Sequence, residues 1–257
     1  MKITILTLFP EMFEGFLTNS IIKRAIAKQC VEVKVANIRE YTKDKYGRTD
    51  TPPIGGGAGL IQKCQPIVDA IKASKTSATH TILMAAQGTT YTEKKAKEYS
   101  SLPDLLIVCG HYEGIDERVN SYVDELVSIG DFVLTGGEIP AMAIADSVIR
   151  LLDGAIASES LEKESFNDNL LEYPQYTEPY DYEGQTVPDI LYSGNHEAIE
   201  KWRRKQSLLL TKKLRPDLFM KLSLTKLDKK LLAEEDGTTP KWEADAILKG
   251  RKFMKKD

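Results

Sequence analysis

The chain has 257 residues, of which 42% are hydrophobic and 28% charged, and its formal net charge is −3. This composition is typical of a globular protein with one or two domains, and it excludes a disordered chain and a small disulfide-stapled scaffold. No apolar run is long enough to span a bilayer or to form a signal peptide, and the cysteines form no CxxC pair. We therefore expect a cytoplasmic protein with reduced thiols.

The first 150 residues alternate short apolar runs with helical patterns. The expected strands are Ile3–Leu8, Val31–Ala36, Thr81–Ala85, Leu105–Cys109 and Asp124–Ser128, with a short sixth at Phe132–Leu134. The expected helices are one that Ser20 caps, with Ile21, Ile22, Ala25 and Ile26 on one face, and three over Pro66–Ala73, Thr92–Tyr99 and Pro140–Leu152. Strands that alternate with such helices indicate βαβ units, so the pattern predicts an α/β fold with a parallel sheet.

Charge is distributed unevenly over the rest of the chain. Residues 151–200 contain one basic and 12 acidic side chains, whereas residues 201–257 contain 17 basic and 8 acidic ones. The lysine-rich part is typical either of a solvated helix surface or of a surface that contacts a polyanion. Its pattern is helical from Asn195 onward, and Pro240 is placed to open a last helix. We expect an α/β domain over 1–152, a flexible linker over 153–172 and a mostly helical domain over 173–257.

Common catalytic motifs are absent or incomplete. The glycine-rich segment 54–60 lacks the Gly-Lys pair of a Walker loop and the third glycine of the dinucleotide fingerprint. It indicates either a tight turn or a loop whose backbone approaches a ligand closely. The three histidines are far apart, no HExxH or GxSxG motif occurs, and no cluster of metal ligands is visible.

Two glycine-containing segments follow predicted strands. They are CGHYEGIDERV over 109–119 and SIGDFVLTGGEIPAM over 128–142. Both could be structural connections between strands and helices. Ligands of open α/β sheets, however, bind beyond the carboxyl ends of the strands, which is where both segments lie.

Together with ITILTLFPEMF, LLEYPQYT, VPDILYSGNHEAIEKWRRKQSL and RPDLF, these segments make the sequence resemble the bacterial tRNA (guanine-N1)-methyltransferase family nearly end to end. The resemblance implies the SPOUT class, whose α/β domain contains a deep trefoil knot, and an obligate homodimer that builds each active site from both chains. It also implies methyl transfer from S-adenosylmethionine to N1 of the guanine immediately 3′ of the tRNA anticodon. The resemblance further suggests that Mg²⁺ assists, held by carboxylates and water.

The family match assigns cofactor binding to residues of both segments. These are Gly110, Tyr112, Glu113, Gly114, Ile129, Gly130, Asp131, Phe132, Val133, Leu134, Gly136, Gly137 and Pro140. Their backbone groups could read the adenine edge, and Glu113 could face the methionine amine or the sulfonium. The structural alternative for Glu113 is an acid at a helix N-terminus.

Guanine N1 carries a proton, so its methylation requires a general base and a group that stabilises negative charge on O6. The resemblance assigns the second role to Arg150, whose structural alternative is a partner for a helix C-terminal dipole. The family places its base, an Asp, just before a Ser-Phe pair in the linker, and this position is Glu164 here. Asp168 is a second candidate for the base.

The sequence differs from the family pattern at three further segments, which concern the adenine pocket and the contacts to RNA. Ala85–Gly88 replaces Ser-Pro-Gln-Gly, Asp50–Ile54 replaces Asp-Asp-x-Pro-Tyr, and Tyr176–Pro179 replaces Tyr-Thr-Arg-Pro. The candidate contacts to the anticodon stem-loop are Asn195, His196, Arg203, Arg204, Lys212, Lys213 and Arg215. Asn195 is equally well placed as a helix N-cap.

Two other functions remain possible from the sequence: a SPOUT methyltransferase that acts on another RNA, and a catalytically weak RNA-binding paralogue. A carboxylate at Glu164 together with Arg150 favours the enzyme.

Overall fold

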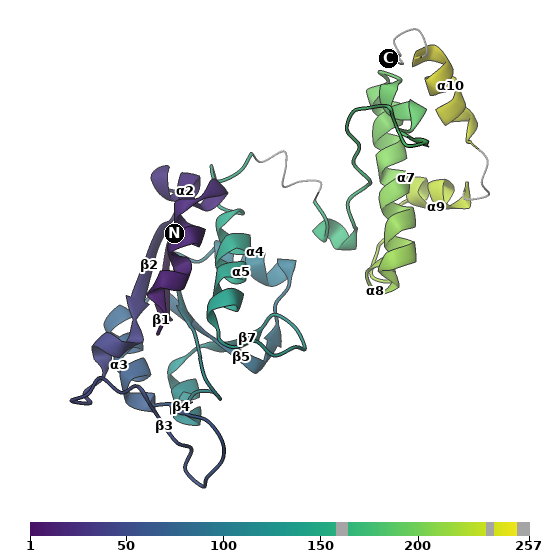
Figure 1. The fold of residues 1–257 in the computed structure, drawn as a ribbon. Helices are drawn as coiled ribbons and strands as arrows, with labels where there is room; N and C mark the ends of the chain where they lie inside the picture. Colours follow the sequence, from purple (N-terminus) through teal and green to yellow (C-terminus); the bar gives the residue numbers. More distant parts are fainter. Residues whose placement is uncertain (158–163, 235–238, 251–257) are drawn as a thin grey trace. The chain divides into compact units, whose positions relative to one another are not determined.

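The computed structural model describes residues 1–157, 164–234 and 239–250 (Figure 1). Its contacts divide the chain into two compact units, Met1–Leu161 and Glu162–Asp257. The first contains a sheet with helices on both faces, and the second is mostly helical, so each is described separately. Within the described ranges, no helix is both long and apolar enough to cross a membrane.

The N-terminal unit is built on a five-stranded sheet whose neighbouring strands all pair in parallel, in the order β2-β1-β6-β5-β7. The strands are β1 (Lys2–Thr7), β2 (Glu32–Asn37), β5 (Thr79–Thr90), β6 (Asp104–Val108) and β7 (Glu125–Ser128). The predicted α/β fold with a parallel sheet is therefore confirmed. A separate antiparallel ladder joins β3 (Asp50–Thr51) to β4 (Ile61–Gln62), and these strands are too short to leave a periodic signal in the sequence.

The predicted strand at Phe132–Leu134 is wrong. After β7 the chain turns at Gly130, whose φ is 151°, and the next residues lie in a loop. Val133 is 92% exposed there. The apolar triplet favoured a strand, but the turn that ends β7 leaves these residues at the rim of the cavity described below.

Alternate residues of the strands pack against opposite helical layers. Ile3 and Leu105 belong to a buried cluster that includes residues of the helices α2 (Ser20–Ala27), α4 (Glu93–Ser100) and α5 (Glu138–Ile149). Leu6 and Leu106 belong to a second cluster, with residues of α3 (Cys64–Ser74) and η3 (Glu117–Tyr122). Side chains of a strand point alternately to the two faces of its sheet, so the nearly continuous apolar runs in the sequence reflect burial on both sides.

The helices of this unit are α1 (Glu14–Thr18), α2 (Ser20–Ala27), α3 (Cys64–Ser74), α4 (Glu93–Ser100) and α5 (Glu138–Ile149), with the 3-10 helices η1 (Pro10–Phe13), η2 (Ile38–Tyr41) and η3 (Glu117–Tyr122). Thr92 caps α4 by accepting a hydrogen bond from the backbone N–H of Lys95 at 3.4 Å. The expectation that Ser20 caps α2 is wrong by one residue, because Ser20 is the first helical residue and Asn19 occupies the cap position.

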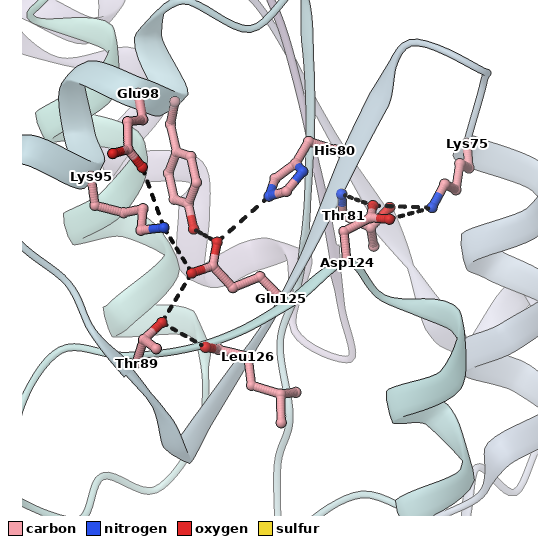
Figure 2. Close-up of polar contacts among 10 residues, drawn as sticks. Lys75, His80, Thr81, Thr89, Lys95, Glu98, Asp124, Glu125 and Leu126 are labelled. Atoms are coloured by element: carbon pink, nitrogen blue, oxygen red, sulfur yellow. Dashed lines mark hydrogen bonds and ion pairs between the residues drawn. The ribbon is translucent and has the colours of Figure 1, made fainter.

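A polar network ties α4 to β7 at the edge of the sheet (Figure 2). The Glu125 carboxylate accepts hydrogen bonds from Tyr99 Oη at 2.7 Å, Lys95 Nζ at 2.9 Å and Thr89 Oγ1 at 2.9 Å. His80 Nε2 lies 3.6 Å from the same carboxylate. Burial alone would raise the pKa of Glu125, but the hydrogen bonds from Lys95, Tyr99 and Thr89 outweigh it and lower the pKa to about 2.

The C-terminal unit is organised around the 19-residue helix α7 (His196–Leu214). Its other elements are η4 (Asn167–Asn169), β8 (Asp181–Tyr182), β9 (Gln185–Thr186), η5 (Asp189–Tyr192), α8 (Pro216–Phe219), α9 (Lys226–Ala233) and α10 (Lys241–Gly250). Leu170 packs with Leu208 of α7 and Leu231 of α9 in a buried cluster. Leu170 lies near the end of the segment 153–172 that the sequence predicted to be a linker, so this part of the segment contacts α7. Pro240 opens α10, since its carbonyl accepts a hydrogen bond from the Glu243 N–H at 2.9 Å.

Candidate functional site

The carboxyl ends of β5, β6 and β7 surround a cavity of about 340 Å³. Its lining comes from β5 at 83–87, from the loop after β6 and the start of η3 between 110 and 120, from the end of β7 and the following loop between 127 and 137, and from Pro140 in α5. Every residue that the family match assigns to the cofactor lines this cavity except Asp131, which is exposed. Segments far apart in the sequence therefore converge at the sheet edge where ligands of open α/β folds bind.

A buried carboxylate joins the loops that form the cavity. Glu138, at the first position of α5, is 1% exposed and accepts a hydrogen bond from Thr7 Oγ1 at 2.8 Å. His111 Nδ1 lies 3.4 Å from the same carboxylate. A Cβ atom at Gly136 would overlap both the Glu138 and the His111 side chains, so a larger residue there would force one or both of them to move. The end of β1, the loop after β6 and the start of α5 thus meet at Glu138.

Sequence reasoning did not select Thr7, His111 or Glu138 as site residues. Each carries a signal that could have been used, because Thr7 ends a buried strand and the other two lie inside the motifs that were singled out. The contact itself is invisible in the sequence, since Thr7 and Glu138 are 131 positions apart.

The segment that contains β4 supports the cavity from outside. The Gln62 side-chain Oε1 accepts a hydrogen bond from the His111 N–H at 3.2 Å, and its backbone N–H donates to the Gly114 carbonyl at 2.9 Å. The preceding glycine-rich loop lies against Glu113, because a Cβ atom at Gly59 would overlap that side chain. The tight-turn interpretation is supported, since Gly55, Gly56, Gly57 and Gly59 all have positive φ, and close approach to a ligand stays a prediction.

Glu113 lies in the loop before η3, whose N-cap is Asp116. Asp116 accepts a hydrogen bond from the backbone N–H of Arg118 at 3.0 Å and fills the capping role. The acidic residue that caps the N-terminus of this helix is therefore Asp116, and Glu113 does not fill the structural role suggested for it. Glu113 remains exposed at the cavity.

The two candidate catalytic residues belong to different units. Arg150 is the C-cap residue of α5 in the N-terminal unit and is half-buried. Glu164 lies near the start of the C-terminal unit, where it lines a second cavity of about 210 Å³. Asp168 lines this same cavity and has a left-handed backbone conformation, with φ 50° and ψ 32°. Both candidate bases therefore face one pocket of their own unit.

Several of the candidate RNA contacts form hydrogen bonds or ion pairs within the C-terminal unit. Asn195 caps α7, since its Oδ1 accepts a hydrogen bond from the Ala198 N–H at 3.2 Å. Arg204 forms a two-pronged pair with the buried Asp228 at 2.8 and 2.9 Å, and the Arg204 guanidinium lowers the pKa of Asp228 to about 2. Arg215 pairs similarly with Asp217, and Arg203 with Glu200 at 2.7 Å. His196 opens α7, and Lys212 and Lys213 are exposed in its last turn.

Within the described ranges, no group of three or more His, Cys, Asp or Glu side chains could hold a metal ion. The departure at Ala85–Gly88 lies in β5, where the strand pairing shifts register between Met84 and Thr89. Ala85, Ala86 and Gln87 line the first cavity, so this departure alters the wall of the site itself.

Comparisons with known proteins identify the family. The family model described as tRNA (Guanine-1)-methyltransferase TrmD matches residues 1–221. A tRNA (guanine-N(1)-)-methyltransferase of Clostridium botulinum strain Hall is 52% identical over 236 residues, which cover 91% of this chain and 98% of the relative. The protein of the same name from Clostridium perfringens strain ATCC 13124 is 52% identical over 234 residues, covering 90% and 99%. The chain therefore belongs to the tRNA (guanine-1)-methyltransferase TrmD family.

Proposed function

We propose that this chain transfers a methyl group from S-adenosylmethionine to N1 of the guanine immediately 3′ of a tRNA anticodon. Membership of the family and the names of the relatives support both the reaction and tRNA as the substrate. The cavity beyond β5, β6 and β7 is the observation that carries the proposal, since all but one of the expected cofactor residues line it.

The residues present fit a nucleoside methyl donor. The cavity volume of about 340 Å³ falls within the range of roughly 300–1,000 Å³ that is usual for ligand sites. The lining combines glycine backbone with apolar side chains such as Leu134 and Pro140, which suits a heteroaromatic ring whose edges need backbone partners. When bound, S-adenosylmethionine supplies an electrophilic methyl group on a sulfonium. The exposed Glu113 carboxylate would hold a positive charge of the cofactor, the methionine ammonium or the sulfonium.

Two side chains act on the guanine during methyl transfer, one as a general base and one as a hydrogen-bond donor. The Glu164 carboxylate accepts the N1 proton as the methyl group is transferred, so that no positive charge builds up on the base. The Arg150 guanidinium donates hydrogen bonds to O6, where negative charge accumulates as N1 loses its proton. The protein otherwise contributes alignment, because the displacement at the methyl group requires N1 in line with the departing sulfur.

The remaining proposals follow the family resemblance. The functional unit is a homodimer in the cytoplasm, with Arg150 and Glu164 of one site supplied by different protomers. The loops at 110–117 and 129–137, which a bridge between His111 and Gly136 connects, are the crossing segments of a trefoil knot. Mg²⁺ assists through carboxylate and water ligands. The C-terminal unit binds the anticodon stem-loop through α7, with Lys213 exposed for a phosphate contact.

The experiment measures methyl transfer from labelled S-adenosylmethionine to an unmodified tRNA with guanine 3′ of the anticodon. Wild type is compared with Glu164→Gln and with Asp168→Asn, a matched variant in the same pocket. We expect Glu164→Gln to lose transfer by roughly 100-fold or more while it still binds the cofactor, and Asp168→Asn to keep it.

Each other outcome has a defined meaning. If only Asp168→Asn loses activity, the base is Asp168. A wild-type chain that binds tRNA and cofactor without transferring a methyl group would refute the enzyme and favour an RNA-binding paralogue. Transfer to a different RNA alone would place the chain among SPOUT enzymes with another substrate.

A further inference from the structure

A loop of the N-terminal unit displays an aromatic ring beside two cations. Tyr46 is 68% exposed, although a tyrosine ring is largely apolar. Lys45 Nζ lies 4.7 Å and Arg48 Cζ lies 5.1 Å from the centroid of this ring. In the part of the chain that the structure describes, neither cation forms a salt bridge, in contrast to Lys43, which pairs with Asp69; the Arg48 charge acts on the Asp44 carboxylate only at longer range. Both charges are thus available to an anionic partner.

The loop is held in a defined conformation. Asp44 Oδ1 accepts hydrogen bonds from the backbone N–H groups of Tyr46 at 2.8 Å and Arg48 at 3.3 Å, and the bond from Tyr46 lowers the pKa of Asp44. Gly47 turns the chain with a φ of 72°, and its carbonyl accepts a hydrogen bond from Arg39 Nη1 at 2.9 Å. The ring is therefore presented by a structured turn, which reduces the entropy lost when a partner binds it.

The loop is also connected to the cavity lining by consecutive backbone hydrogen bonds. It leads directly into β3, and the Thr49 carbonyl accepts a hydrogen bond from the Lys63 N–H at 2.8 Å (Figure 1). The neighbouring Gln62 of β4 bonds through its N–H to the Gly114 carbonyl and through its carbonyl to the Asp116 N–H. The loop of Tyr46 and the lining of the cavity are therefore joined by one hydrogen-bonded segment of the N-terminal unit.

We propose that Lys45, Tyr46 and Arg48 form an RNA-contact surface of the N-terminal unit, which stacks on an unpaired base near the target guanine and binds the adjoining phosphates. This inference rests on the proposed function and adds a contact outside the C-terminal unit. Unpaired loop bases stack on aromatic rings and on arginine planes, whereas lysine and arginine bind phosphates, so this combination of side chains matches single-stranded RNA. Among the cation–π contacts of the described residues, the Tyr46 ring alone has two cations over it.

The test distinguishes stacking on the aromatic ring of Tyr46 from a merely apolar contact at this position and from the contribution of the neighbouring charges. Binding of an unmodified tRNA with guanine 3′ of the anticodon is measured for wild type, Tyr46→Phe and Tyr46→Leu. We expect Tyr46→Leu to weaken RNA binding roughly ten-fold, because it removes the stacking surface, and Tyr46→Phe to bind like wild type. Cofactor affinity and the transfer rate at saturating tRNA stay unchanged, since neither variant touches the cavity lining.

Charge is tested by salt dependence. The pair Lys45→Gln and Arg48→Gln lowers the slope of log affinity against log salt by about 1.4, the value for two lost single-strand phosphate contacts. The matched pair Lys23→Gln and Lys34→Gln removes two exposed lysines from α2 and β2 of the same unit and leaves the slope unchanged.

Equal RNA affinity for wild type and Tyr46→Leu would overturn this surface, as would equal weakening by Tyr46→Phe and Tyr46→Leu. Failure of the wild-type chain to bind the tRNA at all would instead refute the proposed function. The two failures are therefore distinguishable in one titration series.

Discussion

Replacement of Glu125 by Gln tests the network that ties α4 to the sheet edge (Figure 2). Lowering of the Glu125 pKa from 4.5 to about 2 corresponds to roughly 3 kcal/mol of stabilisation of the ionised carboxylate. The side chain is 19% exposed, and Gln retains part of the hydrogen bonding. We therefore expect Glu125→Gln to lower the free energy of unfolding of the N-terminal unit at pH 7 by about 2 kcal/mol.

The pH dependence has a defined sign. Because the folded pKa of Glu125 is lower than the unfolded one, its stabilisation is complete above about pH 5 and is lost as pH falls from about 4.5 towards 2. The difference between wild type and Glu125→Gln should shrink over that window. Denaturant unfolding followed by circular dichroism measures it, and hydrogen exchange of α4 and β7 peptides localises it.

The matched control is Glu98→Gln. Glu98 is 49% exposed and, among the described residues, its one ion pair is with Lys95 at 3.3 Å, so its loss should cost less than about 0.5 kcal/mol. A Glu125→Gln difference that stays constant from pH 7 to pH 3, or one no larger than that of Glu98→Gln, would refute the reasoning.

Three other expectations concern the site and the C-terminal unit. Gly136→Ala should weaken S-adenosylmethionine binding at least ten-fold, because the new Cβ displaces the loops that meet at Glu138; calorimetry that shows unchanged affinity would contradict this. Asp228→Ala should destabilise the C-terminal unit by roughly 2–3 kcal/mol, less than a fully buried pair, since Arg204 is 37% exposed. Both tryptophans of the chain lie in the C-terminal unit, so their fluorescence reports the unfolding of this unit directly. An unfolding transition of Asp228→Ala at the wild-type denaturant concentration would contradict the expected strength of the Arg204–Asp228 pair. Mixed dimers of Arg150→Ala and Glu164→Ala chains should recover partial methyl transfer, whereas verified heterodimers without activity would exclude a site shared between protomers.

The C-terminal basic residues show why side-chain roles are harder to predict than elements. Arg204 and Lys213 look equivalent in the sequence, as basic residues of one helix. In the structure Arg204 is paired with Asp228, which comes from the next long helix, while Lys213 is exposed. Pairing across helices depends on how they pack, and no local pattern encodes it.

Local sequence patterns were sufficient to predict most strands of the sheet and the location of the cavity. The apolar runs at Ile3–Leu8 and Leu105–Cys109 predicted strands because buried parallel strands are apolar on both faces. The sequence offered Asn195 equally as a cap and as an RNA contact, and the structure places it as the cap of α7. The motifs after two strands located the cavity, since strand carboxyl ends bind ligands in this class of sheet.

Only the tertiary structure shows which residues of those motifs contact each other and which are exposed. The contact of Glu138 with Thr7 and His111 joins residues up to 131 positions apart, and the exposed loop at Phe132–Leu134 replaced a predicted strand because the turn after β7 carries these residues to the cavity rim. Propensity and periodicity act over a few neighbouring residues, whereas such contacts depend on the order of strands in the sheet. The sequence therefore determined the elements and the location of the site, and the packing of the chain determined its walls.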